Sequence, residues 1–232
     1  MGSVLPVTSE GSGGTTWREQ AVARSLDSAR TRAENRVQRF LDAALELMDH
    51  GSTKDFTVQE VVERSGQSLR SFYQYFGGKH ELLLALFEEA IRTTAGVLRE
   101  KTDEIDDPGE RLHRFVVEYY LICRPPAKKG AKKAPTPTPS PVLVEFAQQL
   151  LTAHPTEAAS AFVPLVSLFE EILDGAAKAG AIRDTFDRRR AAGVLLESIM
   201  FNTFSATISG TKLQPGEDAA EELWDLLFNG LG

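Results

Sequence analysis

The segment TVQEVVERSGQSLRSFYQYFGGK, residues 57–79, constrains the fold most, because it reads as two short helices joined by a tight turn. Thr57 with Glu60 three residues later has the spacing of a capping box, which predicts a helix start. Gly66 can take the left-handed backbone conformation that ends this helix, and Ser68 is a suitable N-cap for the next one. The segment therefore predicts a helix-turn-helix, a motif that places its second helix in the major groove of DNA.

The second of these helices is expected to be apolar on one side and polar on the other. Leu69, Phe72 and Phe76 recur at helical spacing and are the expected apolar anchors. The outward face is then rich in Arg, Ser, Tyr and Gln, which suits contact with phosphates and base edges. We expect base contacts from Arg70, Ser71 and Gln67 or Gln74, and phosphate contacts from Thr57, Ser68, Tyr73, Tyr75 and Lys79, with Gln59 as a further DNA-binding candidate.

The motif SLRSFYQYFGGKHELL, residues 68–83, resembles the recognition helix of the TetR family of bacterial transcriptional regulators. An apolar-faced helix over 36–49 extends the likeness, which covers about residues 34–91. Two positions depart from the family pattern: Gln67 replaces a small apolar residue, and Gly78 replaces a Ser or Asp cap. The resemblance implies a helix-turn-helix head that a long helix joins to an all-helical body, which binds an effector and a second subunit.

Helical periodicity without any alternating strand pattern predicts an all-α fold for the whole chain. We divide it into a flexible arm (1–30), with frayed helix after Trp17 as an alternative, the helix-turn-helix domain (31–78) and an effector-binding and dimerisation domain (79–232). The expected helices are 32–50, 57–64, 68–76, 79–101, one from Pro108 to Cys123, 141–153, 155–180, 187–208 and 215–230, with a kink or a helix start at Pro164. For two segments, the arm and the Pro/Lys-rich loop, the sequence allows both a functional and a non-functional interpretation. Arginines of the arm (Arg18, Arg24, Arg30 or Arg32) either touch DNA or belong to a tail without a role. The Pro/Lys-rich loop 124–141 is expected to be disordered, and its lysines either contact DNA or an acidic partner or are simply solvated.

Composition limits the classes of function. The net charge of −7 excludes adhesion to DNA through bulk charge, but it leaves room for a local positive face. The single cysteine, Cys123, excludes an internal disulfide and fits a reducing cytoplasm. The sequence shows no apolar run long enough to span a bilayer and no signal-peptide pattern at its start. We expect a cytoplasmic protein.

The body carries the expected dimer interface and effector site. Its last two helices are apolar over broad faces, and a terminal hairpin of this kind needs a partner surface. The interface candidates are Leu195, Ile199, Leu223, Trp224 and Leu227. Aromatic residues of the middle helices either fill the core or, as the resemblance implies, line a cavity for a small hydrophobic or amphipathic effector such as a lipid, acyl thioester, steroid or aromatic drug. The candidates are Phe115, Tyr119, Tyr120, Phe146, Phe162, Val166, Phe169 and Phe201.

Other chemistry finds no support in the sequence. The four histidines, His50, His80, His113 and His154, lie far apart and lack metal-ligand spacing, and there is no phosphate-binding loop or catalytic motif. We therefore expect no metal, no cofactor and no enzymatic activity. The leading hypothesis is a homodimeric repressor that an effector releases from a palindromic operator. The alternatives are a helical ligand-binding or interaction module without specific DNA binding, and an activator or other DNA binder that needs no effector.

Overall fold

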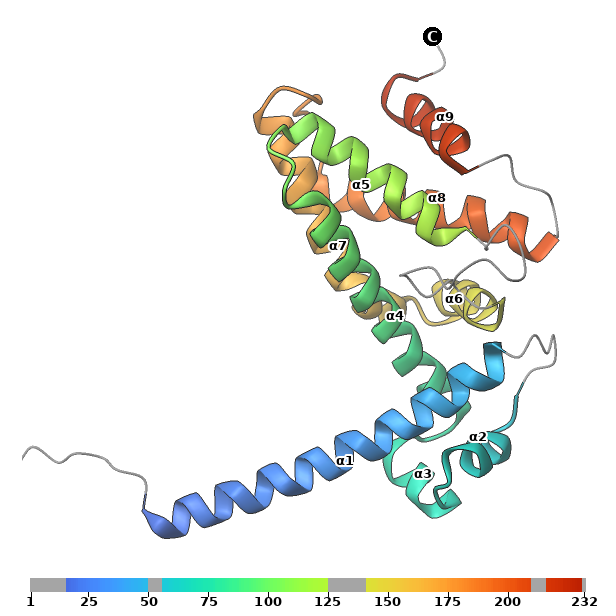
Figure 1. Ribbon diagram of the computed structural model, residues 1–232. Helices are drawn as coiled ribbons and strands as arrows, with labels where there is room; N and C mark the ends of the chain where they lie inside the picture. Colours follow the sequence, from blue (N-terminus) through green and yellow to red (C-terminus); the bar gives the residue numbers. More distant parts are fainter. Residues whose placement is uncertain (1–15, 50–55, 125–140, 210–215, 231–232) are drawn as a thin grey trace, which may run out of the picture.

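The computed structural model describes residues 16–49, 56–124, 141–209 and 216–230, and within these ranges every regular element is an α-helix (Figure 1). The expected all-α fold is confirmed. The helices are α1 (Trp17–Asp49), α2 (Val58–Ser65), α3 (Leu69–Tyr75), α4 (Lys79–Thr102), α5 (Pro108–Cys123), α6 (Pro141–Ala153), α7 (Pro155–Lys178), α8 (Arg188–Ser209) and α9 (Gly216–Phe228). Among these described helices none is long and apolar enough to cross a membrane.

The head consists of α2, α3 and the C-terminal half of α1, packed around three phenylalanines. Phe40 of α1 lies edge-on against Phe72 of α3, with ring centroids 5.4 Å apart, and Phe76 lies 5.3 Å from Phe72. All three are buried, as are Val61 and Val62 of α2. The two short helices are therefore held by burial of large apolar side chains, which a helix of seven or eight residues needs to be stable.

Helix α1 begins much earlier than expected. It runs for 33 residues from Trp17, so residues 17–30 are helical and do not belong to a flexible arm. The physical reason is local: this stretch holds neither Pro nor Gly, and the Thr16 N–H donates to Glu19 Oε2 at 2.7 Å at its start. Residues 1–15 of the expected arm lie outside the described part of the chain.

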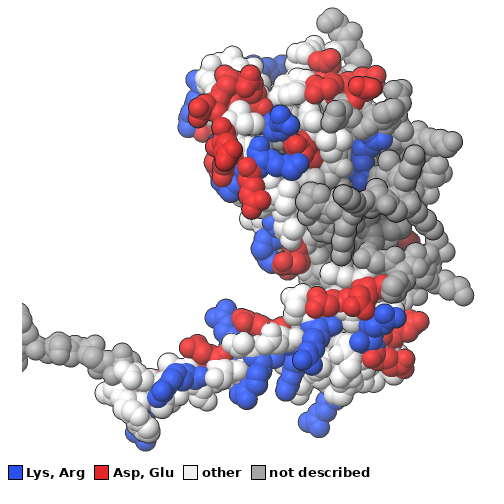
Figure 2. Space-filling model, viewed as in Figure 1, with Lys and Arg blue, Asp and Glu red and all other residues white. Residues whose placement is uncertain are grey.

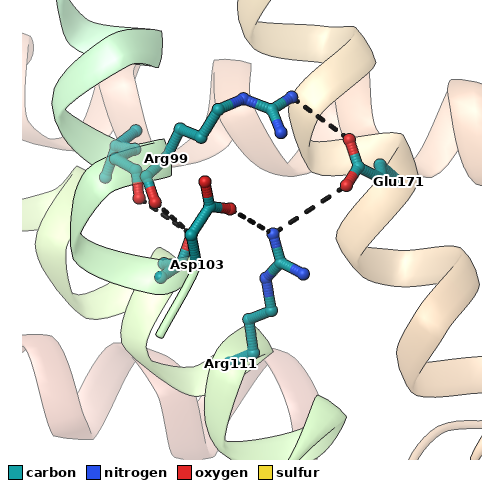
Figure 3. A network of polar contacts seen from close by, with 6 residues as sticks. Arg99, Asp103, Arg111 and Glu171 are labelled. Carbon is teal, nitrogen blue, oxygen red and sulfur yellow. Dashed lines mark hydrogen bonds and ion pairs between the residues drawn. The ribbon is translucent and has the colours of Figure 1, made fainter. Parts of the chain in front are cut away.

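Helix α4 leaves the head and packs along α7 in the body. The two helices run in the same direction, because His80 pairs with Glu157 near their first turns and Arg99 pairs with Glu171 further along. At this far end Arg111 of α5 joins the pair, 2.8 Å from Asp103 Oδ1 and 3.8 Å from Glu171 Oε1 (Figure 3). The network ties three helices of the body together.

The body differs from expectation at Pro164 and in the packing of helix α9. Pro164 lies in the interior of α7, and one helix continues on both sides of it, so it marks no helix start. Helix α9 packs across α5 and does not form a hairpin with α8 (Figure 1). Here His113 of α5 contacts Glu221 at 2.7 Å and the Trp224 ring at 4.8 Å. Of the Pro/Lys-rich loop, residues 125–140 lie outside the described ranges.

Candidate nucleic-acid interface

The turn between α2 and α3 has the caps that its sequence suggests. The Thr57 hydroxyl accepts the Glu60 N–H at 3.2 Å, and the Thr57 N–H donates to Glu60 Oε2 at 2.7 Å, so the capping box is complete. This backbone hydrogen bond holds the pKa of Glu60 below its ordinary value. Gly66 ends α2 with φ of 64°, and the Ser68 hydroxyl accepts the Ser71 N–H at 3.1 Å to start α3.

The outer face of α3 presents three of the expected residues to solvent. Arg70, Tyr73 and Gln74 are exposed, and Tyr73 keeps 57% of its surface accessible. Leu69 was expected to be an apolar anchor, and this is wrong: it is 44% exposed, because Phe72 and Phe76 fill the core without it. The exposed face of α3 is therefore broader than the sequence suggested and includes an apolar side chain.

Two of the expected outward residues turn toward the protein. Ser71 Oγ is buried and has no hydrogen-bond partner among the described groups, so its hydroxyl does not face outward as expected. Tyr75 is half-buried against the core. Gln67 is half-buried as well, whereas Gln59 on α2 is exposed.

Three of the expected phosphate contacts already have partners inside the head. Lys79 Nζ donates to the Phe56 carbonyl at 2.6 Å and lies 4.4 Å above the Phe56 ring. The Thr57 hydroxyl is hydrogen-bonded to Glu60, and Ser68 serves as the N-cap of α3. These groups hold the start of α2 and α3 in place. A phosphate contact from Lys79 or Thr57 stays a prediction.

A stripe of arginines on α1 adds to this surface. Arg32, Arg36 and Arg39 follow one another at i, i+4 and i+7, and Arg18 lies close to four turns before Arg32, so all four share one side of the helix. All four are exposed. Arg30 lies on another side, where it pairs with Glu34 at 2.7 Å. We call the four residues the α1 arginine stripe. Their helical spacing is visible in the sequence, but it was not recognised because residues 1–30 were expected to be a flexible arm.

Figure 2 shows how the charge is divided. Lys and Arg atoms follow the lower side of α1 and lie below α3, whereas Asp and Glu atoms follow the upper side of α1 and crowd the top of the body. The chain is acidic as a whole, with a net charge of −7, yet it carries a positive side where α3 is exposed. Such a local positive side is what a polyanion requires.

The expected effector residues are part of a packed interior. Phe115, Tyr119, Tyr120, Phe146, Phe162 and Phe169 are buried, and Val166 and Phe201 are half-buried. Phe115 and Phe169 stack with centroids 4.4 Å apart, which leaves no space between them. A pocket of about 320 Å³ lies instead beside the head, and among these candidates Phe146 alone lines it, together with Lys79, His80, Leu83, Val142, Glu145 and Gln149.

The expected interface residues differ in how much surface they offer. Leu195 of α8 and Leu223, Trp224 and Leu227 of α9 are half-buried. Ile199 is 1% exposed and fills the chain's own core, so in this conformation it offers no surface to a partner, contrary to expectation. Among the described side chains of the two helices, the most exposed apolar ones are Val194, at 55%, and Leu226, at 46%.

Known proteins resemble both the head and the whole fold. Residues 40–86 match the family described as bacterial regulatory proteins, tetR family. The HTH-type transcriptional regulator BetI of Brucella canis is 29% identical over 81 residues, which are 35% of this chain and 41% of BetI. The fatty acid degradation regulator FadR of Bacillus halodurans superimposes with a TM-score of 0.63 at 18% identity, covering 84% of this chain and 95% of FadR. FadR of Bacillus subtilis, solved in complex with stearoyl-CoA, gives 0.62 at 17% identity and covers 84% and 99%.

The head, the exposed recognition helix and the all-helical body define a helix-turn-helix protein of the DNA-binding class. Over residues 40–86 the head matches the tetR family of bacterial regulatory proteins, and the fold of the whole chain is similar to that of the solved FadR regulators. The match to the curated relatives spans 41–42% of their own length.

Proposed function

We propose that the protein is a homodimeric transcriptional repressor that binds a palindromic operator and leaves it when a small effector occupies the body. The observation that carries the proposal is the α2–α3 unit: three buried phenylalanines and two side-chain caps fix α3 so that Arg70, Tyr73 and Gln74 project outward. We further propose that the protein acts in the cytoplasm and that its function includes no catalytic step.

The symmetry of a dimer supports the palindrome. One short helix reads too few base pairs for useful specificity, and two heads related by a two-fold axis read two half-sites about 34–36 Å apart. The α1 arginine stripe then supplies phosphate contacts beyond the recognition helix, which position the head without reading sequence.

The pocket beside the head supports control by an effector. Its volume of about 320 Å³ lies at the lower end of the range for small-molecule sites, and polar groups of Lys79, His80, Glu145 and Gln149 share its wall with Leu83, Val142 and Phe146. An effector seated there touches α4 at the point where it leaves the head. The stearoyl-CoA bound to FadR of Bacillus subtilis makes acyl thioesters the first effectors to try.

The test is selection from a pool of randomised duplexes at near-physiological salt. Enrichment of an inverted repeat with half-sites about one helical turn apart is the expected result. Acyl thioesters and other hydrophobic ligands are then screened for release of protein from the enriched duplex. If folded, dimeric protein enriches no sequence in the presence or absence of such ligands, the operator-binding proposal is wrong.

A further inference from the structure

Two of the histidines that the sequence leaves far apart meet in the fold. His80 lies in the first turn of α4 and His154 is the N-cap of α7, and their ring centroids are 4.7 Å apart. Glu157, in the first turn of α7, lies between them: its Oε2 is 2.7 Å from His80 Nε2 and its Oε1 is 3.6 Å from His154 Nδ1.

These three groups have the chemistry of a transition-metal site. Two imidazole nitrogens and one carboxylate oxygen form a donor set that zinc takes in proteins, with a fourth position left to water or another ligand. Their ligand atoms all lie within 4.8 Å of one another. A tetrahedral ion bound at about 2.0–2.1 Å places its ligands about 3.3 Å apart, so side-chain adjustment of about an ångström suffices.

The surroundings suit an ion that enters from solvent. The three side chains are 38%, 42% and 40% exposed in the order His80, His154 and Glu157, which leaves a path for entry. The Phe146 ring lies 5.4 Å from the His80 ring and forms an apolar wall on one side. His80 also borders the pocket that Glu145 and Gln149 line, so further oxygen donors lie nearby.

The body offers an internal comparison. His113 and Glu221 pair at 2.7 Å with 36% and 53% exposure, which is close to the geometry of His80 with Glu157. The neighbour of His113 is the indole of Trp224, where His80 has a second imidazole. A histidine–glutamate pair alone is a surface ion pair; the second histidine is what makes the first cluster a candidate ligand set.

We propose that His80, His154 and Glu157 bind one zinc ion per chain and join the first turn of α4 to the first turn of α7. The ion then lies one residue from Lys79, whose ammonium holds the Phe56 carbonyl just ahead of α2. Metal occupancy therefore fixes the head relative to the body. Any effect on operator affinity rests on the proposed function, whereas the binding of metal does not.

The test uses untagged, full-length protein stripped with a chelator and titrated with Zn²⁺ by calorimetry in the absence of DNA. The expected result is one ion per chain, and Co²⁺ in its place should give the visible absorption of a four-coordinate site. His154→Gln and Glu157→Gln should each weaken Zn²⁺ binding by more than about tenfold. His113→Gln, the matched control, should bind as the unchanged protein does.

Folding of the variants is checked by comparing their melting curves in chelator with that of the unchanged protein. Should a variant fail to fold, imidazole NMR of the unchanged protein still decides the question, since Zn²⁺ must shift the His80 and His154 resonances and leave His113 in place. The proposal is overturned if the unchanged protein takes up no zinc, if both variants keep its affinity, or if His113 is the resonance that moves. A second titration with operator DNA present separates failure of the metal site from failure of the DNA-binding proposal.

Discussion

Arg70 is the side chain on which sequence recognition should depend most. It is exposed on α3, between the buried Phe72 and the exposed Leu69. Arg70→Ala should cost about 1–3 kcal/mol against the best operator and relax the preference at one base pair in each half-site. Competition among operator variants measures this. Arg92→Ala, on an exposed arginine of α4 that pairs with Glu89, is the control. Equal losses on all operator variants would show that Arg70 reads no base.

Cys123 should be inert in the folded protein. It is buried among body helices, and burial raises the pKa of its thiol to about 12. Burial likewise raises the pKa of the neighbouring Tyr119, whose hydroxyl donates to the Leu196 carbonyl. Because the thiolate is the reactive form, a thiol reagent at about pH 8 should label native protein far more slowly than the chain in denaturant. Comparable rates in the two states would contradict the burial.

The same shift predicts a loss of stability in alkali. The folded state keeps the Cys123 proton up to about pH 12, whereas the unfolded chain releases it near the ordinary value of 9.0. Stability from this group is therefore fully present below pH 9.0 and declines between that pH and about 12. Unfolding by denaturant at several alkaline pH values measures the decline. Cys123→Ala should flatten it, and an equal decline in that variant would assign the effect to other groups.

At the scale of single residues, the local caps and the burial of Phe72 and Phe76 could be predicted, whereas the exposure of Leu69 and the burial of the Ser71 hydroxyl could not. The capping box of Thr57 and Glu60 and the left-handed Gly66 depend on neighbours within a few positions, and both occur as the sequence suggests. The inward turn of the Ser71 hydroxyl and the exposure of Leu69 depend on how α3 packs in the head. Nothing within the motif itself fixes that packing.

The turn between the two short helices is an element whose conformation requires glycine. Gly66 has φ of 64°, and a Cβ there would meet no atom within 4 Å, so Gly66→Ala should cost only the backbone penalty of about 1–2 kcal/mol. Gly96, exposed in the middle of α4, also leaves open space for a Cβ. Gly96→Ala should therefore stabilise by about 0.5–1 kcal/mol. Melting curves of the two variants should shift in opposite directions; a shift of the same sign would contradict this account.

The α1 arginine stripe should act through charge alone. Replacing Arg32, Arg36 and Arg39 by Gln should weaken binding to all duplexes alike and reduce the salt dependence by about one unit for each phosphate contact removed. Binding measured across a series of salt concentrations tests this. Arg30→Gln is the control, because Arg30 is paired with Glu34 on another side of the helix. If the triple variant keeps the original salt slope, the stripe does not lie on DNA.

Element boundaries followed from the sequence wherever a cap or a proline marked them. Pro108, Pro141 and Pro155 begin α5, α6 and α7 as expected. The start of α1 was missed because polar composition was taken for flexibility, although residues 17–30 hold good helix formers. The packing of α9 on α5 depends on contacts such as that between His113 and Trp224, which lie more than a hundred residues apart. No local sequence pattern predicts such a pair.

For the whole molecule, the proposed dimer makes the apolar surface of α8 and α9 the place to test. Val194→Glu and Leu226→Glu place a charge at the two most exposed apolar positions among the described side chains of these helices. Each should shift the protein toward monomer in sedimentation and weaken operator binding, because a buried unpaired charge is costly at an interface. Val163→Glu on α7, at 44% exposure, is the control and should leave the assembly unchanged. A dimer unaffected by both changes would place the interface elsewhere.

The candidate metal site could not be predicted from the sequence, because it depends on packing between helices that are far apart in the chain. His80 and His154 are 74 positions apart, and only the packing of α4 along α7 brings their rings together. The aromatic effector candidates are buried, and Phe115 stacks on Phe169. Their role in binding an effector stays a prediction.

The network of Arg99, Asp103, Arg111 and Glu171 makes α4 a lever with its fulcrum in the body. The helix has 24 residues and so extends about 36 Å from that fulcrum toward the head. A swing of about 5° at the fulcrum moves the Lys79 end by about 3 Å, close to the rise of one base pair. Such a swing must also move His80 against Glu157 of α7, and it is enough to put the two heads of the proposed dimer out of phase with the grooves of the proposed operator.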